Sequence, residues 1–79
     1  MNILLVDDDV YVTETLQKSI DWISLGVENV YAAHSVDGAK KILEEIPIHI
    51  LICDIEMPKE NGFALLEWIN EREYVIKQI

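Results

Sequence analysis

Two apolar runs that lead into aspartate constrain the fold of this chain more than any other feature. The first run covers Ile3 to Val6 and is followed by Asp7 and Asp8, and the second covers Ile48 to Ile55 and includes Asp54 near its C-terminal end. Short continuous apolar runs are typical of strands that are buried on both faces. We therefore expect two buried strands, each with acid at its carboxyl end.

The segments between these runs have the spacing of amphipathic helices. Asp9 is placed to cap a first helix and Gly26 to end it, and a second helix is expected between an N-cap at Ser35 and a stop at Pro47. A third helix is predicted from about Gly62. The residues expected to face inward from the three helices are Val12, Leu16, Ile20, Ile23, Ala39, Ile42, Leu43, Ile46, Leu65, Leu66 and Ile69.

Two further strands complete an alternation of strand and helix. Val27 to Ala33 is less apolar and is expected at a sheet edge, and Val75 to Ile79 reads as the opening of a fourth strand. In the run from 48 to 55, one face should carry Ile48, Ile50 and Ile52, and the other Leu51 and Cys53. This alternation predicts one α/β domain with a doubly wound parallel sheet, in which ligands bind beyond the carboxyl ends of the strands.

If the first and third strands are neighbours, Asp7, Asp8 and Asp54 converge at one rim of the sheet. Two unit charges ~5 Å apart repel by about 3 kcal/mol at an effective dielectric of ~20. Such a group must take up protons or hold a cation. Oxygen ligands without nearby histidine or cysteine favour a hard ion, and Mg²⁺ suits a site with few carboxylates and several waters.

A carboxylate beside Mg²⁺ can also attack phosphorus and form an acyl phosphate. Asp54 is the better nucleophile candidate, since it stands alone at the end of its strand with a loop after it. Asp7 and Asp8 come as a pair, which suits holding metal and waters, and Glu56 is placed to add a backbone carbonyl as a ligand. Asp9 is expected to serve as a cap only.

The sequence resembles bacterial response-regulator receiver domains, the phosphorylated half of two-component signalling. The resemblance is carried by Leu5 to Asp9, by Asp37 to Ala39 and by Ile52 to Gly62, and it covers essentially the whole chain. The tract from Ile20 to Gly26, with Asp54 to Pro58, is similar to regulators that carry an AraC-type DNA-binding region further along.

This resemblance implies a flavodoxin-like fold and assigns a role to each acid. It implies that Asp54 accepts phosphate from a histidine kinase and that Asp8 binds Mg²⁺ directly. Asp7 would assist through water, and the Glu56 carbonyl would be a further ligand.

A family receiver has five strands and five helices, with a Ser or Thr ending strand four and a Lys ending strand five. The present sequence stops before both positions, so we expect about four strands and three helices, with a fourth strand exposed at the sheet edge. These residues alone are therefore expected to be phosphorylated and to switch less efficiently than a complete receiver. Uncovered apolar surface there predicts a dimer.

The charge of the chain excludes several other functions. Six basic residues against fifteen acidic ones give a net charge of −9, which argues against direct nucleic-acid or membrane-surface binding. The lone Cys53 and the lack of a signal-like start favour a cytoplasmic protein. His34 and His49 are expected to be ordinary surface or strand-end residues. The alternatives are a Mg²⁺-dependent phosphatase with an aspartyl nucleophile, or an interaction module that is not phosphorylated.

Overall fold

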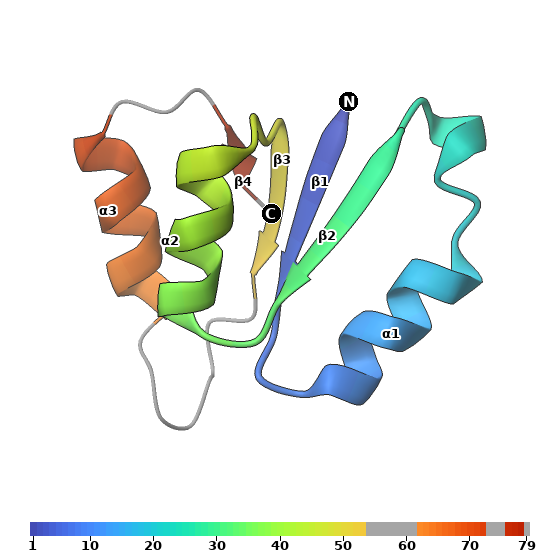
Figure 1. The fold of residues 1–79 in the computed structure, drawn as a ribbon, viewed down its shortest axis with the longest axis horizontal. Coiled ribbons are helices and arrows are strands. Elements are labelled where there is room, and N and C mark those ends of the chain that lie inside the picture. The colour runs from blue at the N-terminus through green and yellow to red at the C-terminus, as the bar shows by residue number, and fades with distance from the viewer. Residues whose placement is uncertain (54–61, 73–75, 79) are drawn as a thin grey trace.

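The computed structural model of the protein describes residues 1–53, 62–72 and 76–78. Along these residues the chain forms β1 (Asn2–Val6), α1 (Val10–Ser19), the short 3-10 helix η1 (Ile23–Leu25), β2 (Asn29–Ala33), α2 (Val36–Glu45), β3 (Ile50–Cys53), α3 (Gly62–Glu71) and β4 (Lys77–Gln78) (Figure 1). None of the helices described is long and apolar enough to cross a membrane.

The strands form a single parallel sheet in the order β2-β1-β3-β4. β1 is therefore central, and Val6 pairs with Ala33 on one side and with Cys53 on the other. The prediction that the first and third strands are neighbours is confirmed, as is the edge position of the second strand. Because all ladders are parallel, the carboxyl ends of β1, β2 and β3 lie at the same rim of the sheet.

Two layers of helix enclose this sheet. Figure 1 shows α2 and α3 together on one side of it and α1 on the other. Side chains alternate along β1, so that Leu4 and Val6 join the core under α2 and α3, while Ile3 and Leu5 face α1. Leu4 is fully buried, and burial of one such leucine contributes about 1.5–3 kcal/mol.

The first helix differs from its prediction in length and in its inward face. Asp9 caps it as expected, since its side chain accepts a hydrogen bond from the Tyr11 N–H at 2.9 Å. The helix ends at Ser19, however, and Gly26 instead ends η1, with a left-handed φ of 81°. Ile23 is 84% exposed in that short helix and does not face the core.

Local side-chain bonds explain the early end of α1. The Asp21 carboxylate accepts from the Ser24 hydroxyl at 2.6 Å and from the Ser24 N–H at 3.3 Å. The indole N–H of Trp22 donates to the Leu16 carbonyl oxygen at 3.2 Å. These bonds offer the backbone a turn in place of further helix. On the inward face, Leu16 packs as predicted, but its buried companion is Thr13 and not Val12.

The second and third helices agree with their predictions. Ser35 caps α2 by accepting from the Gly38 N–H at 3.0 Å, and Ala39 and Leu43 are buried. In α3, Leu65 and Ile69 are fully buried. Leu66, Ile42 and Ile46 pack against the same core from partly buried positions.

The third strand corrects one prediction about its faces. Ile48 does not lie with Ile50 and Ile52, since it joins the core cluster of Leu51 under α2 and α3. The strand begins only at Ile50, after a bend at His49, so the alternation of faces does not extend back to residue 48. The predicted end of this strand at residue 55, and residues Val75 and Ile79 of the predicted fourth strand, lie outside the described residues.

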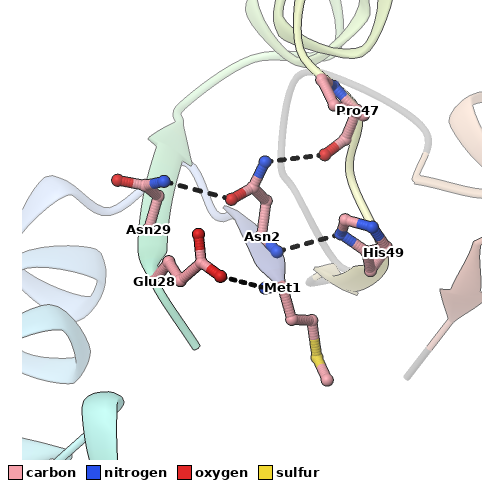
Figure 2. A network of polar contacts seen from close by, with 6 residues as sticks. All are labelled: Met1, Asn2, Glu28, Asn29, Pro47 and His49. Carbon is pink, nitrogen blue, oxygen red and sulfur yellow. Dashed lines mark hydrogen bonds and ion pairs between the residues drawn. The ribbon is translucent and has the colours of Figure 1, made fainter. Parts of the chain in front are cut away.

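A polar network joins the starts of β1 and β2 to the segment that leads into β3, at the end of the sheet opposite the acidic residues. Figure 2 shows its members, which are Met1, Asn2, Glu28, Asn29, Pro47 and His49. The Asn2 side chain donates to the Pro47 carbonyl oxygen at 2.9 Å and accepts from the Asn29 amide at 3.2 Å. Its main chain donates to His49 Nδ1 at 3.0 Å and accepts from the His49 N–H at 2.9 Å. Asn2 thus links the start of β1 to both neighbouring segments.

Candidate metal centre at the carboxyl end of the sheet

Asp7 and Asp8 follow the central strand β1 directly, at the carboxyl end of the sheet. Val6 ends β1 and pairs with Cys53, the last residue of β3, so Asp7 and Asp54 follow paired positions in the sequence. The Asp7 N–H donates to the Ala33 carbonyl oxygen at 3.1 Å, which extends the contact with β2 by one residue. Asp54 and Glu56 lie outside the described residues.

The three consecutive aspartates have three different environments. Asp7 is half-buried, and its Oδ1 accepts from the Asp9 N–H at 2.9 Å. Asp9 is exposed and caps α1, which confirms its expected role. Asp8 is exposed between them. The turn therefore uses Asp7 and Asp9 to hold its own backbone and presents Asp8 to solvent.

The donor set of this turn fits a hard divalent cation. Two carboxylates at neighbouring positions beyond a central strand offer only oxygen ligands, and Mg²⁺ prefers oxygen. The exposure of Asp8 leaves room for the waters that Mg²⁺ retains. Within residues 1–53, 62–72 and 76–78, no group of three or more His, Cys, Asp or Glu residues gathers in a metal-binding arrangement. Asp7 and Asp8 can thus supply part of a centre, and the remaining predicted ligands belong to the segment that is not described.

A pocket of about 170 Å³ opens beside the turn, between α1 and the sheet. It is lined by Leu5, Val6, Asp7, Thr13, Leu16, Ile52 and Cys53. Cys53 is partly buried and packs against the core cluster that contains Leu51, the residue predicted to share its face of the strand.

Two residues near the site were missed by the sequence reasoning. Thr13 is only 1% exposed, and its Oγ1 lies 3.0 Å from Nε2 of His34, the residue that follows β2. The expectation of a surface or strand-end position for His34 is confirmed, since it is exposed and follows β2, but its contact with Thr13 was not predicted. The sequence evidence for the burial of Thr13 was its position three residues before Leu16, on the same face of the helix. The apolar spacing from Val12 to Leu16 led to the prediction of Val12 as the inward residue instead.

The sequence matches the response regulator receiver domain family over residues 3–79. The transcriptional regulatory protein DcuR of Escherichia coli is 35% identical over 68 residues, which cover 84% of this chain and 28% of DcuR. A solved two-component transcriptional regulator, AraC from Clostridium phytofermentans, is 26% identical with a TM-score of 0.89, over 99% of this chain and 60% of that one.

A second solved structure, the MaeR response regulator bound to beryllium trifluoride, gives a TM-score of 0.85 at 25% identity and covers 100% of this chain and 64% of that one. The chain spans less than a third of the length of these first curated relatives. The matched fold is the expected flavodoxin-like doubly wound sheet, with its acidic turn after the central strand. This chain belongs to the response regulator receiver domain family of two-component signalling.

Proposed function

We propose that this receiver domain accepts a phosphoryl group on Asp54 from a sensor histidine kinase in the presence of Mg²⁺. The observation that carries the proposal is the register of the sheet, in which Val6 pairs with Cys53 and the acidic turn follows directly. In the sequence, Asp54 comes one residue after Cys53, as Asp7 comes one residue after Val6. In the transfer, a bond forms between an Asp54 carboxylate oxygen and phosphorus while the bond from phosphorus to the kinase histidine breaks.

The other acids are assigned to the cation. Asp8 would be its direct ligand, Asp7 would act through water, and the Glu56 carbonyl would complete the protein's share. When bound, Mg²⁺ supplies positive charge against the incoming phosphoryl oxygens. The chain's own contribution is a turn whose backbone is already held by the Asp7 and Asp9 carboxylates, so that Asp8 needs little reordering.

Incubation with acetyl phosphate and Mg²⁺, followed by intact mass measurement and peptide mapping, tests the proposal. The expected result is one added phosphoryl group on Asp54, absent from Asp54→Asn and from samples with excess chelator. Asp21→Asn is the matched control, because Asp21 is an exposed acid in the turn after α1. An adduct that persists in Asp54→Asn, or that maps to another residue, would contradict the assignment.

The output of the phosphorylated protein is proposed to be transcriptional. DcuR and the Clostridium regulator carry that description, and both extend well beyond the matched region. With a net charge of −9, these residues are not expected to contact DNA themselves.

We assign the domain no enzymatic turnover. The phosphatase alternative predicts continuous hydrolysis of a phosphate ester that stops in Asp54→Asn, and the same samples test it. The cytoplasmic location remains a prediction.

A further inference from the structure

The acidic turn is held at both ends by two adjacent residues of the second strand and its exit. At its start, the Asp7 N–H donates to the Ala33 carbonyl oxygen at 3.1 Å. Past its end, Thr13 Oγ1 meets His34 Nε2 at 3.0 Å. Ala33 and His34 follow one another in the chain, so one short segment holds both β1 and α1.

The direction of the Thr13–His34 bond follows from the proton count. Thr13 Oγ1 has one proton, which it donates to the Val10 carbonyl oxygen at 2.9 Å. The hydroxyl oxygen therefore accepts the second bond, and His34 Nε2 is the donor. A neutral histidine donates from Nε2 in the tautomer that carries its proton on that nitrogen.

The bond acts on the part of α1 that fixes Asp8. Val10 and Thr13 form the first turn of the helix, and only Asp8 and Asp9 separate this turn from Asp7. Thr13 is the buried polar residue of the described part of the chain, and it lines the pocket beside Asp7. If the first turn shifted against β2, the backbone of Asp8 would shift with it. Mg²⁺ demands near-ideal ligand geometry, so such a shift would reduce its affinity.

We propose that Thr13 and His34 form a positioning pair, whose hydrogen bond fixes the first turn of α1 against the end of β2 and so sets Asp8 for the divalent cation. This inference rests on the proposed function. Neither residue is assigned to touch the metal or the phosphoryl group. Residues that orient a metal ligand through a hydrogen bond typically change affinity by about 10–100-fold when removed. Because this pair acts through backbone, we expect a weaker effect, of about three- to tenfold.

Titration of the 79-residue chain with Mn²⁺, followed by the EPR signal of the free ion, measures the effect directly. Mn²⁺ takes the same oxygen ligands as Mg²⁺. Thr13→Val keeps the shape and removes the hydroxyl, and His34→Ala removes the donor. Each should weaken Mn²⁺ binding about three- to tenfold, and the double variant should be no weaker than either single one. Thr13→Ser and His34→Gln keep the hydrogen-bonding groups and should bind nearly as the parent does.

Thr15→Val is the matched control, because Thr15 is an exposed threonine on the same helix, and its affinity should not change. Circular dichroism excludes unfolding, and His34→Ala carries the test should Thr13→Val fail to fold, since His34 is exposed. Suppose that Asp8→Asn abolishes Mn²⁺ binding. Parental affinity in both Thr13→Val and His34→Ala, or additive losses in the double variant, would then overturn this inference and leave the proposed metal centre standing. A parent that binds no Mn²⁺, or an Asp8→Asn variant that binds normally, would overturn the proposed metal centre and this inference with it.

Discussion

Replacement of Asn2 by alanine should lower the free energy of unfolding by about 1–2 kcal/mol. The Asn2 side chain makes two hydrogen bonds, to the Pro47 carbonyl oxygen and from the Asn29 amide (Figure 2). A typical bond of this kind contributes about 0.5–1.5 kcal/mol net, and both lie at an exposed site, which places the sum toward the lower part of the range. The two main-chain bonds between Asn2 and His49 do not need the side chain and should remain.

Urea denaturation followed by tryptophan fluorescence measures this loss. For a chain this small the dependence on urea is about 1 kcal/mol/M, so the midpoint should fall by roughly 1–2 M with an unchanged slope. Asn29→Ala removes only one of the two side-chain bonds and should cost about half as much. In the double variant the shared bond can be lost only once. Its loss of unfolding free energy should therefore be smaller than the sum of the losses in the two single variants.

Asn70→Ala is the control, since Asn70 lies exposed on α3 and is not a member of this network. Alanine is the better helix former, so this variant should keep or slightly raise the midpoint. Affinity for Mn²⁺ should be unchanged in Asn2→Ala, because the network lies at the opposite end of β1 from Asp8. A midpoint equal to the parent's, or a larger loss in Asn29→Ala than in Asn2→Ala, would refute the assignment of the stability to these side-chain bonds.

Three further outcomes are expected. Asp9→Ala should cost about 1 kcal/mol in the same urea assay, because it removes the cap bond to the Tyr11 N–H, and parental stability would contradict that role. Bonds from the Ser24 hydroxyl and then the Ser24 N–H hold the pKa of the Asp21 carboxyl below its ordinary value of 3.8. The stabilisation that the ionised Asp21 carboxylate contributes is therefore present above pH 3.8 and is lost as the pH falls through the pKa of Asp21 in the folded state. Asp21→Asn should consequently reduce the dependence of the unfolding free energy on pH in this acidic range. Light scattering should find a dimer, since β4 lies at the edge of the sheet, and a well-folded monomer at micromolar concentration would contradict it.

Much of the architecture follows from signals that are local in sequence. The alternation of apolar runs and helical stripes is enough to predict a parallel sheet, and the sheet order then brings the ends of β1 and β3 together. The caps at Asp9 and Ser35 are also local, since each side chain bonds an N–H two or three residues later. Such features depend on neighbouring residues only, so the sequence displays them directly.

The errors in α1 have a different origin. Helical spacing of apolar residues continues through Ile20 and Ile23, but spacing alone cannot show that Asp21 and Ser24 will bond to each other and turn the chain. The Thr13 hydroxyl donates within its own helix turn to the Val10 carbonyl oxygen, but its second partner, His34, is 21 residues away at the exit of another strand. Helical spacing alone cannot show such a contact.

The candidate site therefore depends on a strand that carries none of its predicted ligands. Asp7 and Asp8 follow β1, and in the sequence Asp54 follows the paired strand β3, yet the contacts that join the acidic turn and α1 to a neighbouring strand come from Ala33 and His34 at the end of β2. β2 lies at the edge of the sheet, where a change in its exit can alter the turn without disturbing the β1–β3 ladder. Metal affinity and global stability should consequently respond to different substitutions. Metal affinity should depend on the pair of Thr13 and His34, and global stability on the network around Asn2 at the opposite end of the sheet.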